Sequence, residues 1–352
     1  MAHMTAQTID TISEFMLHAG TDYRVYDMGR GIESMDSQKF IELENNQLPA
    51  PCPRTGHAWF GIVFWNKKTS HEQYIWFVKL PIDERSLIVQ AARNQFLEAV
   101  VTALGSELEK NAEKGGQLPE NPFIFTPSQQ QLADVNAMIR RDLGLSTREG
   151  LGKAIDYIKS PAANTWQDLA LQDIADLAAH INQTDIALAV NQNLATLPVQ
   201  VLTALCSSLE NTCFEDALTD QLIDLFVTAQ YAETQHMILR GLKGSQCTNK
   251  VSLFIEALLT EGKPDTECLV IIAGRHFRLL ENEALLITFC SKLIEHDPSY
   301  QLFRGIYSDL VQVPTSRMGL LKLMRKTDLP APIANAIASL YQQVSQPKSA
   351  TK

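Results

Sequence analysis

The segment HAWFGIVFWNKKTSHEQYIWFVKL, residues 57–80, contains two apolar runs joined by a short polar connector. His57 to Trp65 and Gln73 to Leu80 are rich in aromatic and β-branched residues, which favour strands. The connector NKKTSH has the length of a hairpin loop, so we expect the two strands to pair antiparallel. Both runs are apolar at odd and at even positions, so both faces of the sheet have to be covered.

The flanking segments supply further strands and the covering helices. Residues 23–28 and 39–43 read as strands, joined by a turn at residues 29–31, whose two glycines allow positive φ. Residues 8–19 carry apolar side chains at helical spacing, and Gly20 is a suitable stop. Residues 84–110 form the longest such stripe, and we expect this helix to cover the sheet, with the first helix on the opposite face. An uncovered face would be an interaction surface.

From residue 128 onward the pattern is helical throughout. About thirteen amphipathic segments fit between residues 128 and 344, which corresponds to a helix pair roughly every 34 residues. Such pairs bury their single apolar stripe against neighbouring pairs, so we expect an α-solenoid-like helical-repeat domain. The tetratricopeptide signature is absent, so the repeat is degenerate or the domain is an irregular bundle.

These patterns predict a mostly α-helical chain with four parts. Residues 4–110 form an α+β module with a small antiparallel sheet, and residues 111–127, rich in Gly, Pro and polar residues, form a linker. Within the linker, the apolar run at residues 123–125 is expected to contact a neighbouring element. Residues 128–345 form the helical-repeat array, and residues 346–352 are a frayed tail.

Composition narrows the cellular context and the classes of partner. The apolar runs are too short to span a membrane, and the N-terminus lacks the pattern of a secretory signal, so we expect a cytoplasmic protein without a membrane partner. Six cysteines without metal-ligand spacing are read as free thiols. A net charge of −10 argues against general nucleic-acid binding, although residues 299–352 carry seven basic and two acidic groups.

Three groups of residues have the composition of a chemical site, but a structural explanation is favoured for each. The cluster Asp83-Glu84-Arg85 follows a strand end, but Asp83 also suits a helix N-cap. Glu233 and His236 form one ExxH pair, whereas helical metal centres use two. Residues 274–278, GRHFR, have the charge to grip a phosphate or carboxylate, or to complement a helix C-terminus. We therefore predict no catalytic, cofactor or metal residues and no cofactor.

Two groups of side chains are candidate interaction residues. Trp59, Trp65 and Trp76 lie on the two strong strands, and tryptophan is prominent in the energetics of protein interfaces. Basic residues of the C-terminal region have the sign required for an acidic partner or RNA, although no aromatic residues alternate with them. These residues are Arg317, Lys322, Arg325 and Lys326.

Two sequence motifs resemble a bacterial family known only as a domain of unknown function: YDMGR, at residues 26–30, and IWFVKLPIDERSLIVQAARNQFLEAV, at residues 75–100. The resemblance extends over nearly the full length. It implies a bacterial, cytoplasmic protein of about this size, and it implies no activity, substrate or site residue.

The predicted architecture favours a scaffold or adaptor that binds protein partners, since stacked helix pairs present a long surface. Its assembly state is not predicted. An accessory factor for RNA or a ribonucleoprotein, acting through the basic C-terminal region, is the first alternative. An enzyme with a noncontiguous site near Asp83 to Arg85 is the second.

Overall fold

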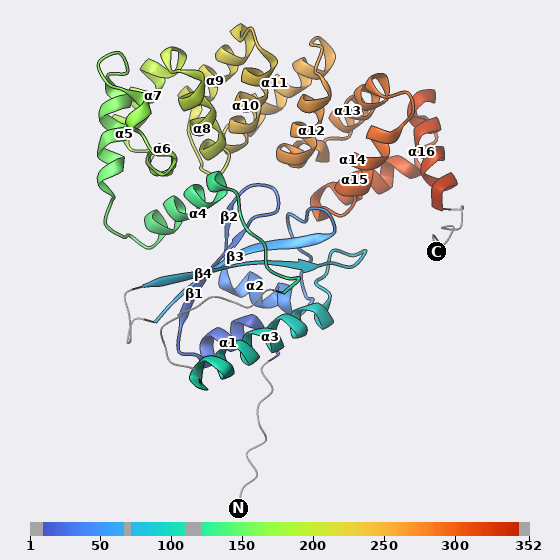
Figure 1. Cartoon of the computed structure of the whole chain (residues 1–352). Helices are drawn as coiled ribbons and strands as arrows, with labels where there is room; N and C mark the ends of the chain where they lie inside the picture. Colours follow the sequence, from blue (N-terminus) through green and yellow to red (C-terminus); the bar gives the residue numbers. More distant parts are fainter. Residues whose placement is uncertain (1–9, 67–71, 110–120, 345–352) are drawn as a thin grey trace, which may run out of the picture. The chain divides into compact units, whose positions relative to one another are not determined.

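The structure is a computed structural model that describes residues 10–66, 72–109 and 121–344 (Figure 1). The chain divides into two compact units, Met1–Ser128 with Gln312–Pro314, and Gln129–Val311 with Thr315–Lys352. The first unit contains the sheet, and the second is helical. The predicted hairpin connector after Asn66, most of the predicted linker and the predicted tail lie outside the described residues.

A four-stranded antiparallel sheet in the order β2-β1-β3-β4 forms the centre of the first unit (Figure 1). The strands are β1 (Asp22–Asp27), β2 (Glu33–Met35), β3 (His57–Trp65) and β4 (Gln73–Pro81). β3 and β4 pair along their whole length, from His57 opposite Pro81 to Trp65 opposite Gln73. This register confirms the antiparallel pair expected from the sequence.

The predicted strand at residues 39–43 is wrong, because this segment is helical. α2 spans Ser37–Glu44, and its N-cap Asp36 accepts a backbone N–H through its side chain. Phe40 and Leu43 both enter the core, and a spacing of three residues places two side chains on one face of a helix. The strand that pairs with β1 on this side is instead the short β2.

Three helices cover the same face of the sheet: α1 (Ile12–His18), α2 and α3 (Gln90–Glu109) (Figure 1). Ile12 of α1 and Phe96 of α3 belong to one apolar cluster with the strand residues Phe60 and Ile62. The prediction that the long helix covers the sheet is confirmed, whereas the expected place of the first helix on the opposite face is wrong.

The buried carboxylate of Glu44 explains the position of α1. It accepts the backbone N–H groups of Ile12 at 2.6 Å and Ser13 at 3.1 Å, and the Ser13 hydroxyl at 2.6 Å. The end of α2 therefore holds the beginning of α1, which places both helices on one side of the sheet. Burial raises the pKa of Glu44 in spite of these hydrogen bonds.

The opposite face carries Trp59 and Phe77, and both contact Phe125 through edge-to-face ring pairs. Phe125 lies in a segment that extends the sheet beyond β4: Lys79 N–H donates to the carbonyl of Phe123 at 2.7 Å, and Phe125 N–H donates to the carbonyl of Phe77 at 3.1 Å. The expectation that residues 123–125 contact a neighbouring element is confirmed. The role of this face as an interaction surface stays a prediction.

In the described residues from 129 to 344, the structure contains thirteen α-helices and no strand, as the patterns predict. The bounds are α4 Gln129–Asp142, α5 Glu149–Lys159, α6 Leu171–Ala179, α7 Thr184–Asn193, α8 Val199–Leu209, α9 Asp216–Thr228, α10 Ala232–Gly241, α11 Thr248–Thr260, α12 Thr266–Arg275, α13 Glu283–His296, α14 Gln301–Leu310, α15 Pro314–Arg325 and α16 Ala331–Val344.

The helices of this unit form two layers (Figure 1). The even-numbered helices from α4 to α16 pack each on the next, and α5, α7 and α9 pack in the same manner in the second layer. An edge-to-face contact between Phe226 of α9 and Phe254 of α11, with ring centroids 5.0 Å apart, continues the second layer. Because consecutive helices reverse direction, successive members of one layer point the same way.

Among the described residues, no helix has both the length and the apolar character required to cross a membrane. All six cysteines are free thiols, and Cys206, Cys268 and Cys290 are buried, as their places in apolar helical patterns predict.

Candidate functional site

A buried carboxylate joins three successive even-numbered helices. Glu210 is the C-cap of α8, and its side chain is 8% exposed. Its Oε2 accepts the Nε–H of Arg275, from the end of α12, at 2.8 Å, and that of Arg240, from the last turn of α10, at 3.3 Å. Lys243 donates to the backbone carbonyl of Glu210 at 3.1 Å. Two arginines thus pair with the carboxylate, and a third cation binds the backbone of the same residue.

The two arginines keep Glu210 ionised. Burial alone raises the pKa of this carboxyl, but the charges and hydrogen bonds of Arg275 and Arg240 bring the pKa below its ordinary value. The arginines also lie at the C-terminal ends of α10 and α12, where a cation interacts favourably with the helix dipole. In return, Glu210 fixes the position of two arginine side chains that remain partly exposed, at 40% for Arg240 and 19% for Arg275.

The segment 274–278, singled out in the sequence, takes part in this arrangement through Arg275. Its guanidinium does grip a carboxylate, but the carboxylate belongs to the same chain. His276 is buried, with its Nε2 2.8 Å from the carbonyl oxygen of Leu239. Burial lowers the pKa of His276 to about 4, so the ring is neutral at neutral pH and Nε2 is the donor.

A second buried carboxylate lies between α4 and the end of α8. Asp134 is 3% exposed, and its Oδ1 accepts the hydroxyl of Ser208 at 2.6 Å and the amide N–H of Gln130 at 2.9 Å. Its Oδ2 accepts the amide N–H of Asn211 at 3.0 Å. Burial raises the pKa of Asp134 to about 7, because these neutral donors offset only part of the lost hydration.

The raised pKa of Asp134 predicts a pH dependence of stability. Between its ordinary pKa of 3.8 and about 7, the folded chain holds a proton on Asp134 that the unfolded chain releases. The contribution of this group to the free energy of unfolding therefore falls as pH rises through this window, by on the order of 4 kcal/mol in total. The variant Asp134→Asn, which does not titrate, is expected to lose that component. Urea denaturation at a series of pH values measures it, and equal slopes for the two proteins would contradict the assignment.

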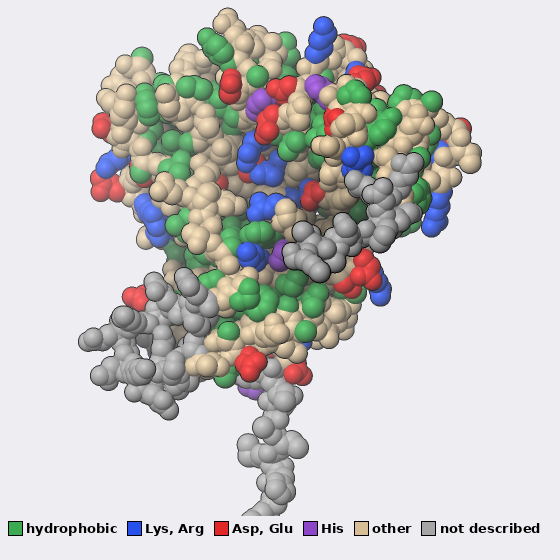
Figure 2. All heavy atoms as spheres, turned by 45° about the vertical axis from the view of Figure 1, so that its right-hand side comes forward, with side chains coloured by type: hydrophobic (Ala, Val, Ile, Leu, Met, Phe, Trp, Pro, Cys, Tyr) green, Lys and Arg blue, Asp and Glu red, His purple; other side chains and the backbone are tan. Residues whose placement is uncertain are grey.

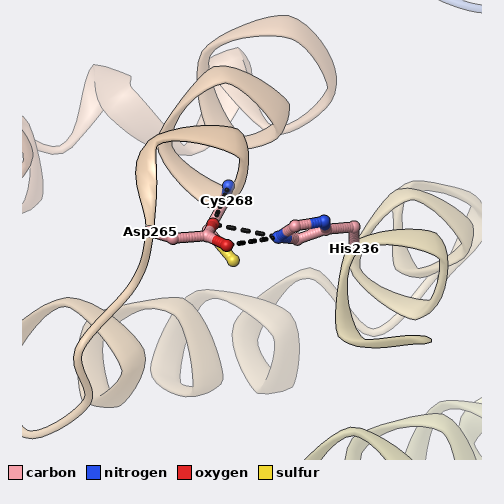
Figure 3. Close-up of side chains that lie close together, drawn as sticks. All are labelled: His236, Asp265 and Cys268. Carbon is pink, nitrogen blue, oxygen red and sulfur yellow. Dashed lines mark hydrogen bonds and ion pairs between the residues drawn. The ribbon is translucent and has the colours of Figure 1, made fainter. Parts of the chain in front are cut away.

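A third cluster combines a histidine, a carboxylate and a thiol (Figure 3). His236 of α10 places Nε2 2.9 and 2.8 Å from the two carboxylate oxygens of Asp265, the N-cap of α12. Cys268, in the first turn of α12, donates its backbone N–H to Oδ1 of Asp265 at 2.9 Å. The sequence paired His236 with Glu233, but the folded chain brings it to Asp265 and Cys268.

The three candidate tryptophans lie on different faces of the sheet. Trp59 and Trp65 share one face and are partly exposed. The guanidinium of Arg54 lies 4.4 Å from the ring centre of Trp59. Trp76 lies on the other face, is 6% exposed and packs against the core rings, including Phe96 at 6.1 Å. The structure thus leaves Trp59 and Trp65 as the surface members of this group.

The four basic candidates all lie on α15 or directly after it. Lys322 and Arg325 are exposed. Arg317 donates through Nε to the carbonyl of Val311 at 2.8 Å, and Lys326 forms an ion pair with Glu283 at 2.5 Å. Their role in binding stays a prediction.

Asp83 caps a turn, so the expectation that it caps a helix is wrong. Its Oδ1 accepts the backbone N–H groups of Arg85 and Leu87, each at 2.8 Å. α3 begins only at Gln90, because Ser86 adopts a positive φ of 65° that interrupts the chain before a helix can start. The Asp83 carboxylate therefore accepts hydrogen bonds from the backbone of its own turn.

Four residues that form these clusters were not predicted from the sequence: Asp134, Glu210, Asp265 and Cys268. A local signal existed for Asp265, since an aspartate three residues before an apolar helical run is typical of an N-cap. Asp134 and Glu210 look like ordinary surface acids, because their partners lie far away in the chain.

Fold and clusters together define a mostly helical protein in which a small α+β module accompanies a two-layered helical unit with buried charged groups. The model of a family described as "Protein of unknown function (DUF3549)" matches residues 7–341, and the chain belongs to this family. The resemblance carried by YDMGR and the run at residues 75–100 is thereby confirmed as a nearly full-length match to an uncharacterised family. Neither a curated protein nor a solved structure matches the chain.

Proposed function

We propose that the helical unit is an α-solenoid-like scaffold that binds a protein partner along the ends of its even-numbered helices. The cluster of Arg240, Lys243 and Arg275 around Glu210 carries the proposal. It comes from three successive helices, and it bears two more positive than negative charges in a chain whose net charge is −10. Such a cluster favours an acidic segment of the partner.

Three further points support this reading. Packing of each even-numbered helix on the next extends the same edge over the whole unit, which is how helical repeats build long binding surfaces. Arginine is suited to carboxylate recognition, because its planar guanidinium presents several donors at once. Figure 2 shows Lys and Arg side chains close to Asp and Glu side chains over the helical unit, a surface of mixed charge that would select a complementary partner.

The test compares two double variants that remove the same charge. Arg240→Gln with Lys243→Gln leaves Arg275 on Glu210, so the buried carboxylate keeps a partner. Lys322→Gln with Arg325→Gln makes the equal change on α15. We expect the tagged wild-type chain, cross-linked in its source cells, to carry a stoichiometric protein partner that the α10 variant loses and the α15 variant keeps.

Other outcomes decide between the readings. A bare monomer after mild purification and cross-linking would refute the scaffold proposal. Association lost in the α15 variant, kept in the α10 variant and released by ribonuclease or by salt would favour the RNA alternative, because phosphate binding is strongly salt-dependent.

A further inference from the structure

We infer that His236, Asp265 and Cys268 form a binding site for a transition-metal dication of the zinc class. One ligand atom from each residue lies within 4.8 Å of the others. The three residues come from the facing parts of α10 and α12, which pack as neighbours, and their side chains converge in Figure 3. The site is independent of the basic cluster around Glu210.

The donor set selects the class of metal. Imidazole nitrogen, carboxylate oxygen and thiolate sulfur together suit zinc and its relatives, whereas magnesium and calcium require oxygen ligands only. Three protein ligands leave a fourth tetrahedral position for water, as in catalytic zinc sites. The side chain of Asp265 is 47% exposed and that of His236 is 18% exposed, so a hydrated ion has access from solvent.

The backbone prepares the carboxylate for this role. Oδ1 of Asp265 accepts the N–H of Cys268, which orients the carboxylate, and both of its oxygens face Nε2 of His236, at 2.9 and 2.8 Å. Outer hydrogen bonds of this kind are typical of metal ligands, because they fix the ligand's orientation. The N-cap position of Asp265 and the first-turn position of Cys268 bring the two side chains to one side of the helix.

Metal binding requires small displacements and the loss of one proton. In a tetrahedral zinc site, neighbouring ligand atoms lie about 3.3 to 3.8 Å apart, so His236 and Asp265 would separate by about half an ångström. Without a metal, the buried thiol of Cys268 carries its proton at neutral pH. The ion would displace this proton to solvent and bind the thiolate, with no change in oxidation state.

Cobalt(II) titration of the purified full-length protein tests the site, because a cobalt–thiolate bond absorbs in the near ultraviolet. We expect one equivalent to bind, with a charge-transfer band that zinc competes away. Cys268→Ser should abolish the band, and Asp265→Asn should weaken binding by more than about tenfold. Asparagine is as good an N-cap as aspartate, so this second variant keeps the helix start intact.

Cys290→Ser is the matched control, since Cys290 is also a buried thiol on a helix of this unit and should leave the band unchanged. Circular dichroism confirms that each variant is folded. Absence of a band in the wild-type protein at a stoichiometric concentration of cobalt would overturn the proposal and leave the three residues as a helix cap with an ion pair. A band that survives Cys268→Ser would place the metal elsewhere and overturn it equally.

Discussion

Replacing Gly29 by alanine is expected to unfold the N-terminal module at ordinary temperatures. A Cβ atom at this position would lie 1.7 Å from the carbonyl oxygen of Cys52 and 2.9 Å from its carbonyl carbon. These are backbone atoms, so no side-chain rotation relieves the clash. Overpacking of side chains costs about 1–3 kcal/mol, and displacement of backbone beside a central strand places this change at about 4 kcal/mol or more.

The contacts around Gly29 explain why the backbone approaches so closely. Its N–H donates to Oδ1 of the buried Asp27 at 2.8 Å, and the next residue, the buried Arg30, donates through Nε to the carbonyl of Pro53 at 3.0 Å. The YDMGR motif therefore packs the end of β1 against the proline-containing loop at residues 51–53. Its distinctive composition reflects packing of the backbone.

Tryptophan fluorescence during urea denaturation measures the effect of Gly29→Ala, because Trp76 lies in the core of the module. Gly152→Ala is the control. Gly152 is exposed inside α5, with no atom within 4 Å of the added Cβ, so alanine should stabilise the helical unit by about 0.5–1 kcal/mol. If Gly29→Ala unfolds at the wild-type urea concentration, the close approach of residues 29 and 52 is refuted.

Replacing Glu210 by glutamine is expected to destabilise the helical unit by about 2–3 kcal/mol. The change keeps the size of the side chain but removes the charge that holds Arg240 and Arg275. Breaking a fully buried pair costs about 3–5 kcal/mol, and the partial exposure of both arginine side chains reduces that figure. Far-UV circular dichroism follows the unfolding, since this unit contains most of the helices.

Glu283→Gln provides the comparison for Glu210→Gln. Glu283 also pairs with a cation, Lys326, but its side chain is 60% exposed, so water and salt screen the pair. We expect no measurable change in the free energy of unfolding for this variant. Equal effects of the two substitutions would show that Glu210 has no special structural role.

The elements predicted with success are those whose pattern is local and long. In β3, β4 and α3, enough apolar residues recur at a constant period to predict the type of element. In the second unit, the repeated apolar stripes predict the helices in the same way. The failure at residues 39–43 has the opposite cause. These five residues carry three apolar side chains, Phe40, Ile41 and Leu43, and suit a strand or a single helical turn equally. The outcome depended on a cap at Asp36 and on burial of Phe40 and Leu43.

The candidate sites were predicted less well, because their members are distant in sequence. His236 meets Asp265 across 29 positions, Arg275 meets Glu210 across 65, and Ser208 meets Asp134 across 74. The sequence did point to His236 and Arg275 as unusual. It did not identify the partner of either residue, because a spacing rule such as ExxH applies only to residues on one helix.

Reading the chain alone is enough to establish an antiparallel sheet followed by a long run of amphipathic helices, because apolar periodicity reports directly which face of each element is buried. The choice of partners for the charged and thiol side chains depends on which helices become neighbours. That choice is made by packing of the even-numbered helices in one layer, which brings the ends of α8, α10 and α12 together. Packing of α4 against α8 buries Asp134 and raises its pKa, and packing of α10 and α12 beside α8 brings two arginines to Glu210.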